Sequence, residues 1–161
     1  MKPRVYVETS VIGYLTSWPS GDLVVAARQK LTRDWWRYAT SAFELVSSEL
    51  VHREASAGDP QAVRERFEHL ADLPVLEVTE KADTLARALV SAGAVPSTEP
   101  EDALHIAIAV VHGIEYLVTW NFKHLANATM RSKIEDACIA EGYDPSTICT
   151  PEELLEPESD V

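Results

Sequence analysis

Residues 5–12 read Val5-Tyr6-Val7-Glu8-Thr9-Ser10-Val11-Ile12, and this order of residue types predicts how the chain is built. The first three residues are β-branched or aromatic, which favours a short strand. After the polar residues, apolar side chains recur at helical spacing, and Thr9 or Ser10 can cap that helix because a hydroxyl accepts the unpaired N–H groups of its first turn. The stretch therefore predicts a strand, a turn and a helix in succession.

The same unit of strand and helix repeats along the chain. Further strands are predicted at residues 43–47, 75–78, 116–119 and 147–150, and further helices at 23–38, 49–55, 61–70, 80–92, 101–112 and 130–141. Strands that alternate with helices in this way imply a mostly parallel sheet with helices on both faces. In such a sheet the ligand site lies beyond the carboxyl ends of the strands.

Length and composition are those of one ordinary globular domain. The chain has 161 residues, of which 46% are hydrophobic and 25% are charged, so it can bury a sizeable core. Its longest apolar run, residues 106–111, is far shorter than a membrane span. Glu8 also interrupts the apolar run that a signal peptide would need. We therefore expect a cytoplasmic protein with no membrane contact.

The net charge of −12 limits the modes of binding. An acidic surface opposes nucleic-acid binding by broad neutralisation of phosphates, unless clustered acids hold divalent cations that supply positive charge locally. It also suits a basic protein partner. The two cysteines, Cys138 and Cys149, have neither CxxC spacing nor a Cys/His cluster, so we expect reduced thiols without a chemical role.

Polar residues recur at the predicted ligand-binding edge of the sheet. Glu8 ends the first strand, and Glu49 follows the second. Asn121 follows the fourth strand, and Asp102 lies at the start of a helix that can pack beside them. A buried carboxylate is costly unless it is paired or binds a cation, and oxygen ligands without His or Cys suit Mg²⁺ and Mn²⁺. Because such ions activate water and bind a scissile phosphate, the pattern predicts phosphodiester hydrolysis.

Several of these residues also have a purely structural interpretation. An acid after a strand or in the first turn of a helix is commonly a cap or a partner of the helix dipole, which applies to Glu49 and Asp102. His105 lies one turn after Asp102, but a lone histidine on an apolar helix is usually a satisfied core residue, and we leave it out of catalysis. Trp35 and Trp36 could stack RNA bases, although aromatic residues at the end of an amphipathic helix are more often core or subunit interface.

Four segments resemble the successive motifs of PIN domains in their order and spacing. They are Val5-Tyr6-Val7-Glu8-Thr9-Ser10, Ser48-Glu49-Leu50, Glu101-Asp102-Ala103-Leu104-His105-Ile106-Ala107 and Leu117-Val118-Thr119-Trp120-Asn121-Phe122-Lys123-His124-Leu125. The last two segments are the most specific, and the resemblance covers nearly the whole chain. Within the superfamily, the chain looks most like the VapC-type toxins of toxin-antitoxin pairs.

The resemblance implies a three-layer α/β/α sandwich with a central, mostly parallel sheet. It implies one nuclease domain over residues 1–150, followed by an acidic stretch over 151–161 that we expect to be a solvated tail. It also implies an acidic quartet that binds Mg²⁺ or Mn²⁺ and cleaves single-stranded RNA.

Carried over residue by residue, the resemblance gives Glu8, Glu49 and Asp102 as catalytic acids and, together with Asn121, as metal ligands. The first and fourth motifs usually carry Asp where this chain has Glu8 and Asn121. The longer glutamate can shift the metal, and the neutral asparagine should weaken a second metal.

Small hydroxyl residues lie next to these acids in the sequence. Thr9, Ser10 and Thr119 match positions whose side chains can hydrogen-bond the carboxylates or a bound water. Capping and strand propensity are the other interpretation of the same residues.

The sequence thus predicts a metal-dependent endoribonuclease for single-stranded RNA, the toxin of a type II pair whose antitoxin contributes a basic segment. Formation of a homodimer is left open. The alternative is a non-catalytic PIN-like module that binds a protein or RNA partner, which Asn121 and the acidic surface favour. An aspartyl-phosphate phosphatase would need a second acid two residues after the nucleophile, but Glu8 is followed by Thr9 and Ser10.

Overall fold

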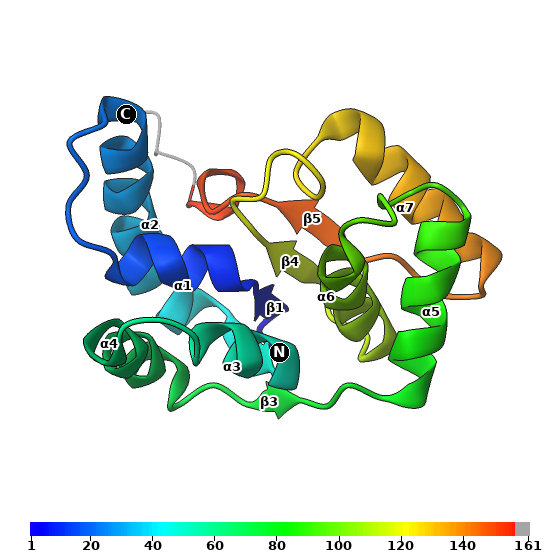
Figure 1. Ribbon diagram of the computed structural model, residues 1–161, viewed down its shortest axis with the longest axis horizontal. Coiled ribbons are helices and arrows are strands. Elements are labelled where there is room, and N and C mark those ends of the chain that lie inside the picture. The colour runs from blue at the N-terminus through cyan, green and yellow to red at the C-terminus, as the bar shows by residue number, and fades with distance from the viewer. Residues whose placement is uncertain (157–161) are drawn as a thin grey trace.

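The computed structural model describes residues 1–156, and a five-stranded, fully parallel sheet lies at the centre of this part of the chain (Figure 1). The strands are β1 (Arg4–Val7), β2 (Glu44–Ser48), β3 (Val75–Leu76), β4 (Tyr116–Val118) and β5 (Thr147–Cys149). They lie in the order β3-β2-β1-β4-β5. Tyr6 of β1 is opposite Val46 of β2 and Leu117 of β4, so β1 is the central strand.

Seven α-helices cover the sheet within the described residues. They are α1 (Thr9–Thr16), α2 (Leu23–Ala42), α3 (Glu49–Ala55), α4 (Pro60–Leu70), α5 (Glu80–Ser91), α6 (Pro100–Val111) and α7 (Ala128–Ala140). Figure 1 shows α1 to α4 on one side of the strands and α5 to α7 on the other. This confirms the predicted three-layer α/β/α sandwich. None of the helices in residues 1–156 is long and apolar enough to cross a membrane.

The order of the strands creates a switch point between β1 and β4. The chain first adds β2 and β3 on one side of β1, and then returns to place β4 and β5 on the other side. Because parallel crossovers are right-handed, this reversal moves the later helices to the opposite face of the sheet. Ligands of open α/β sheets bind beyond the carboxyl ends of the strands at such a switch point.

Side-chain caps fix where most of the helices begin, as the sequence predicts. Asp22 accepts hydrogen bonds from two N–H groups at the start of α2, and Ser48 and Thr79 cap α3 and α5. The expectation for α1 was wrong, since its cap is Glu8 rather than Thr9 or Ser10. The reason is that β1 ends at Val7, so Glu8 keeps an extended backbone and its carboxylate reaches the first turn of the helix.

The two ends of the sheet differ from the sequence expectation. β3 is limited to two residues, because only the last two residues of β2 pair with it. The segment after β5 is not wholly a solvated tail, since Glu152–Leu154 form a 3₁₀ turn and Leu154 and Leu155 pack against the core. The rest of the predicted tail, residues 157–161, lies outside the described residues.

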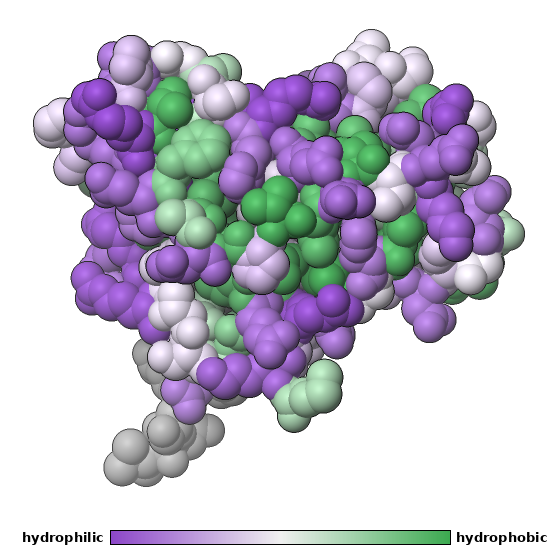
Figure 2. Space-filling view, turned by 90° about the horizontal axis from the view of Figure 1, so that it is seen from below, coloured by the Kyte–Doolittle hydropathy of each residue, from purple (hydrophilic) through white to green (hydrophobic). Residues whose placement is uncertain are grey.

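Apolar surface remains at the open edge of the sheet. Figure 2 shows the face seen from below in Figure 1, on which apolar side chains gather near the centre and hydrophilic side chains surround them. Val75 of the edge strand β3 is exposed. Trp35 is fully buried and Trp36 packs partly buried against the core, so neither offers an open platform for RNA bases.

Candidate metal centre

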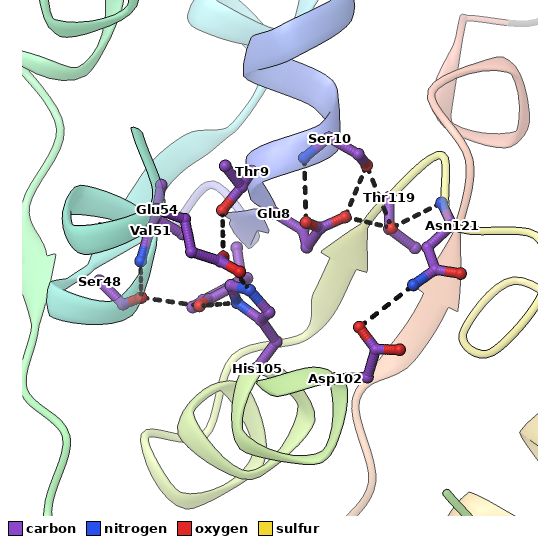
Figure 3. A network of polar contacts seen from close by, with 11 residues as sticks. Glu8, Thr9, Ser10, Ser48, Val51, Glu54, Asp102, His105, Thr119 and Asn121 are labelled. Atoms are coloured by element: carbon purple, nitrogen blue, oxygen red, sulfur yellow. Dashed lines mark hydrogen bonds and ion pairs between the residues drawn. The ribbon is translucent and has the colours of Figure 1, made fainter. Parts of the chain in front are cut away.

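Glu8 lies at the switch point, immediately after the central strand. Its Oε1 accepts hydrogen bonds from the hydroxyls of Ser10 and Thr119, each at 2.5 Å. Its Oε2 accepts the backbone N–H of Ser10 at 2.9 Å. The acid is therefore held by α1 on one side and by the end of β4 on the other (Figure 3).

Glu8 is buried, and its hydrogen-bond donors are all neutral. The residue is 7% exposed, and no Lys, Arg or His among residues 1–156 forms an ion pair with it. Hydrogen bonds to a charged group contribute about 1.5–3 kcal/mol each, so three of them offset much of the several kcal/mol that burial of a carboxylate costs. They add no positive charge, and the arrangement is one that a cation would complete.

Glu54 is the second acid at this edge, and it comes from α3. Its Oε1 lies 2.6 Å from His105 Nε2 and accepts the hydroxyl of Thr9 at 2.7 Å. Burial alone would raise the pKa of Glu54, but the hydrogen bond and charge of His105, helped by the hydrogen bond of Thr9, outweigh it and leave the pKa below its usual value. Ligand atoms of Glu8, Glu54 and His105 lie within 4.8 Å of one another.

Asp102 lies in the first turn of α6 and has its own partners. Its Oδ1 accepts from Asn121 Nδ2 at 3.2 Å, and its Oδ2 lies 2.9 Å from His124 Nδ1. Burial raises the pKa of Asp102, the hydrogen bond and charge of His124 act in the opposite direction, and the net pKa stays above the usual value. Ligand atoms of Asp102, Glu99 and His124 also lie within 4.8 Å of one another.

The residues after β4 connect the two groups of ligand atoms. The hydroxyl of Thr119 donates to Glu8 and accepts the backbone N–H of Asn121 at 3.0 Å, and the amide of Asn121 then donates to Asp102. Figure 3 shows this chain of contacts running from Glu8 to Asp102. The two groups thus contain four acids: Glu8 after β1, Glu54 of α3, and Glu99 and Asp102 at the start of α6.

Most of the residues that the sequence singled out meet here. Glu8, Thr9, Ser10, Asp102, Thr119 and Asn121 all belong to the network drawn in Figure 3. Glu49 does not, because it is exposed at the first position of α3 and belongs to neither group of ligand atoms. Five residues turn a helix by about 500°, so Glu49 and Glu54 point about 140° apart.

A signal for Glu54 was present in the sequence. Glu54 follows Leu50 by four residues and therefore lies on the helix face that Leu50 buries, whereas Glu49 shares a face with the exposed Arg53. The segment Ser48-Glu49-Leu50 favoured Glu49 instead, because Glu49 lies directly after a strand.

Two histidines lie among these acids. His105 is buried and satisfied, as predicted, but its Nε2 contacts Glu54 in the site. His124 contacts Asp102 and was not singled out. His124 could have been found from the sequence because it lies in the segment that follows β4, three residues after Asn121. The two imidazoles are hydrogen-bond partners of the acids, and the carboxylate oxygens suit Mg²⁺ and Mn²⁺.

Solved structures with a similar fold include proteins from three bacteria. VapBC2 from Rickettsia felis, bound to a DNA fragment from its promoter, is 13% identical over 91% of this chain and 98% of that one, with a TM-score of 0.60. VapC20 from Mycobacterium tuberculosis, a sarcin-ricin loop cleaving toxin, is 18% identical over 74% and 92%, with a TM-score of 0.54. FitAcB from Neisseria gonorrhoeae is 11% identical over 93% and 99%, with a TM-score of 0.58. These identities establish similarity of fold.

Sequence comparison identifies the family. A comparison with curated proteins found no match. The family model of the PIN domain, however, matches residues 5–128, a range that includes β1, α3, α6 and the segment after β4. These are the elements that hold Glu8, Glu54, Asp102 and Asn121. The chain therefore belongs to the PIN domain family.

Proposed function

We propose that this chain is a metal-dependent endoribonuclease that hydrolyses phosphodiester bonds of single-stranded RNA. Glu8, Glu54 and Asp102 would be its acids, and Mg²⁺ or Mn²⁺ its cofactor. The observation that carries the proposal is Glu8, a buried carboxylate at the switch point of the sheet with three neutral hydrogen-bond donors and no positively charged partner among residues 1–156.

The hydrogen bonds leave specific oxygens available to a cation. An ionised carboxylate offers about four lone pairs. Both hydroxyl donors to Glu8 use Oε1, and Oε2 accepts only one N–H. Both donors to Glu54 use Oε1, and Oε2 of Glu54 makes no hydrogen bond within the described part of the chain. Thr9, Ser10 and Thr119 thus fix the two acids while leaving ligand oxygens open.

The residues divide the work of phosphodiester hydrolysis. When bound, a divalent cation would supply positive charge for the scissile phosphate and lower the pKa of a water. Glu8 and Glu54 would hold that cation, and Asp102 would be oriented toward it by Asn121 and His124. The positive charge also answers the objection that a chain of net charge −12 should repel RNA.

The test is cleavage of labelled single-stranded RNA in Mg²⁺, Mn²⁺ or EDTA, combined with calorimetric titration of the ions. We expect metal-dependent cleavage, and a loss on the order of 100-fold or more in Glu8→Gln because a charged ligand is removed. Glu44→Gln makes the same change at an exposed position of β2 and should retain wild-type cleavage and metal affinity. Equal cleavage by Glu8→Gln and the wild type would refute the assignment.

We further propose that the biological role is that of a toxin neutralised by an antitoxin with a basic segment. The supporting observations are the net charge of −12, the cluster of acids beyond the carboxyl ends of the strands, and the structural similarity to VapBC2 and to the toxin VapC20. Expression of the chain alone should slow growth, and a co-expressed basic partner should relieve this effect and bind less tightly as salt rises. Normal growth together with purification free of any basic partner would contradict the toxin role.

A non-catalytic binding module is the second candidate, and one observation favours it. Asn121 supplies no charge, and its amide donates to Asp102 instead of presenting its oxygen to the site. A binding module would bind RNA or protein without a divalent ion, and the calorimetric titration would then show no Mg²⁺ or Mn²⁺ binding.

A further inference from the structure

A line of buried hydrogen bonds reaches Glu54 from inside the protein. The hydroxyl of Tyr6 lies 2.7 Å from Ser48 Oγ and 2.7 Å from His105 Nδ1. The other ring nitrogen of His105 lies 2.6 Å from Glu54 Oε1. Tyr6 and Ser48 have no exposed surface and His105 is 1% exposed, so water does not compete for these contacts. Figure 3 shows the line running from Ser48 to Glu54.

The N-cap of α3 determines which groups donate and which accept in this line of hydrogen bonds. Ser48 Oγ accepts the backbone N–H of Val51 at 3.1 Å, so the hydroxyl hydrogen of Ser48 must find another acceptor. Within residues 1–156, its only contact of that kind is the oxygen of Tyr6. Ser48 therefore donates to Tyr6, and Tyr6 donates its own hydrogen to His105 Nδ1.

The reverse direction leaves a buried hydrogen without an acceptor. If His105 Nδ1 donated to Tyr6 and Tyr6 donated to Ser48, the hydroxyl hydrogen of Ser48 would have no acceptor among the described residues. An unsatisfied buried donor is costly.

We propose that Tyr6 and Ser48 are positioning residues that act on Glu54 through His105. The Glu54 carboxylate can only accept, so it requires the hydrogen of His105 on Nε2. By donating to Nδ1, Tyr6 supports the same tautomer and holds the ring in the orientation from which Nε2 donates to Oε1 of Glu54. That bond, with the one from Thr9, fixes the carboxylate so that Oε2 is the oxygen that remains open. That Oε2 of Glu54 binds a cation rests on the proposed function. The assignment of donors and acceptors from Ser48 to Glu54 does not.

The first test needs no variant. In ¹⁵N-labelled, metal-free protein at pH 7.5, NMR of the histidine rings distinguishes an Nε2–H from an Nδ1–H tautomer. We expect His105 to carry its hydrogen on Nε2 alone. A hydrogen on Nδ1 of His105 would overturn the proposal, whatever the nuclease activity.

The second test removes the phenol hydroxyl and keeps the ring. Tyr6→Phe should change the ¹⁵N chemical shift of His105 Nδ1, because that nitrogen loses its donor, and should weaken Mn²⁺ binding, measured by calorimetry, by about three- to tenfold, a smaller effect than loss of a ligand. Tyr116→Phe is the control, since Tyr116 is partly buried on the adjacent strand and its hydroxyl makes no hydrogen bond within residues 1–156. It should change neither quantity.

The outcomes separate this proposal from the proposed function. An unchanged chemical shift of His105 Nδ1 and unchanged Mn²⁺ affinity in Tyr6→Phe would refute the positioning role. If even the wild type binds no Mn²⁺, the proposed function fails, and the Nδ1 chemical shifts of the wild type and of Tyr6→Phe still decide whether Tyr6 donates to His105.

Discussion

Asn121 donates its side-chain N–H to Oδ1 of Asp102 across 3.2 Å, and its own Oδ1 accepts the backbone N–H of His124 at 3.1 Å. Both ends of the amide are therefore engaged. The asparagine holds the Asp102 carboxylate in place by a neutral donor, where a second carboxylate would repel it. Asn121 stands where the resemblance led us to expect Asp, and its amide serves here as a hydrogen-bond donor to Asp102.

Asn121→Asp should tighten Mn²⁺ binding and lower stability when no metal is present. The new carboxylate would lie beside Oδ1 of Asp102 and repel it, and a cation would relieve that repulsion. Two unit charges at 4 Å interact by about 4 kcal/mol at an effective dielectric constant of 20, so a gain of about 1.4 kcal/mol, or tenfold in affinity, is a conservative expectation. Calorimetry gives the affinity, and thermal unfolding in EDTA gives the stability.

Asn127→Asp is the matched control for this change. Asn127 caps α7 in the same part of the chain and takes no part in either group of ligand atoms. It should leave Mn²⁺ affinity unchanged. If Asn121→Asp binds Mn²⁺ no more tightly than Asn127→Asp does, then position 121 lies outside the metal site.

The sheet could be predicted from the sequence because its signals are local. An apolar strand such as Val5–Val7 followed by a cap and a helix is legible without knowledge of the rest of the chain, and the caps at Asp22 and Thr79 were found in this way. The cap of α1 was missed because the carboxylate of Glu8 accepts the N–H group in the first turn that we expected Thr9 or Ser10 to accept.

The site was predicted less completely, because its contacts are not local. Thr119 reaches Glu8 across 111 residues of sequence, and Glu54 meets His105 across 51. Proximity to a strand end identified Glu8 and Asn121, but it favoured Glu49 over Glu54. The spacing of Glu54 from Leu50 pointed to Glu54, and the packing of α3 against the sheet shows that this acid faces inward.

Asp102→Asn should stabilise the metal-free protein. The folded-state pKa of Asp102 is raised, chiefly by burial, so its protonated form favours folding and its ionised form opposes it. The favourable contribution is fully present below the unfolded-state pKa and is lost as pH rises through the folded-state pKa, so at pH 7 the charge is unfavourable. An asparagine keeps the shape without the charge, and we expect the melting temperature in EDTA to rise by roughly 2 °C.

Addition of Mn²⁺ should reverse the difference, so that the wild type has a higher melting temperature than Asp102→Asn. A ligand that binds only the folded protein stabilises it by about 2.7 kcal/mol at 100 times its Kd. Mn²⁺ should therefore stabilise the wild type, whereas Asp102→Asn should not be stabilised in this way. Asp136→Asn, an exposed change on α7, should follow the wild type in both buffers. A lower melting temperature of Asp102→Asn in EDTA would instead identify Asp102 as a structural residue.

The two cysteines should be unreactive in the folded protein. Burial raises the pKa of Cys138 to about 11 and that of Cys149 to about 12. Because the thiolate is the reactive form, a thiol reagent at pH 8 should modify neither residue in the native state and both in denaturant. Rapid modification of either thiol in native protein, followed by mass spectrometry, would contradict the buried positions of these side chains.

The two acids of α3 allow the sharpest test of the site, because Glu49→Gln and Glu54→Gln make the same chemical change five residues apart on one helix. Glu54→Gln removes the charge that faces Glu8 and His105, so Mn²⁺ affinity and RNA cleavage should fall by on the order of 100-fold. Glu54→Gln should also lose less stability than the wild type on acidification. The folded-state pKa of Glu54 is lowered, so its carboxylate stabilises the folded protein above the unfolded-state pKa. This stabilisation disappears as pH falls through the folded-state pKa. Glu49→Gln changes an exposed side chain and should match the wild type in affinity, cleavage and acid unfolding. Calorimetry, RNA cleavage and acid titration of the three proteins supply the comparison, and loss of activity in Glu49→Gln with full activity in Glu54→Gln would return the second acid to position 49.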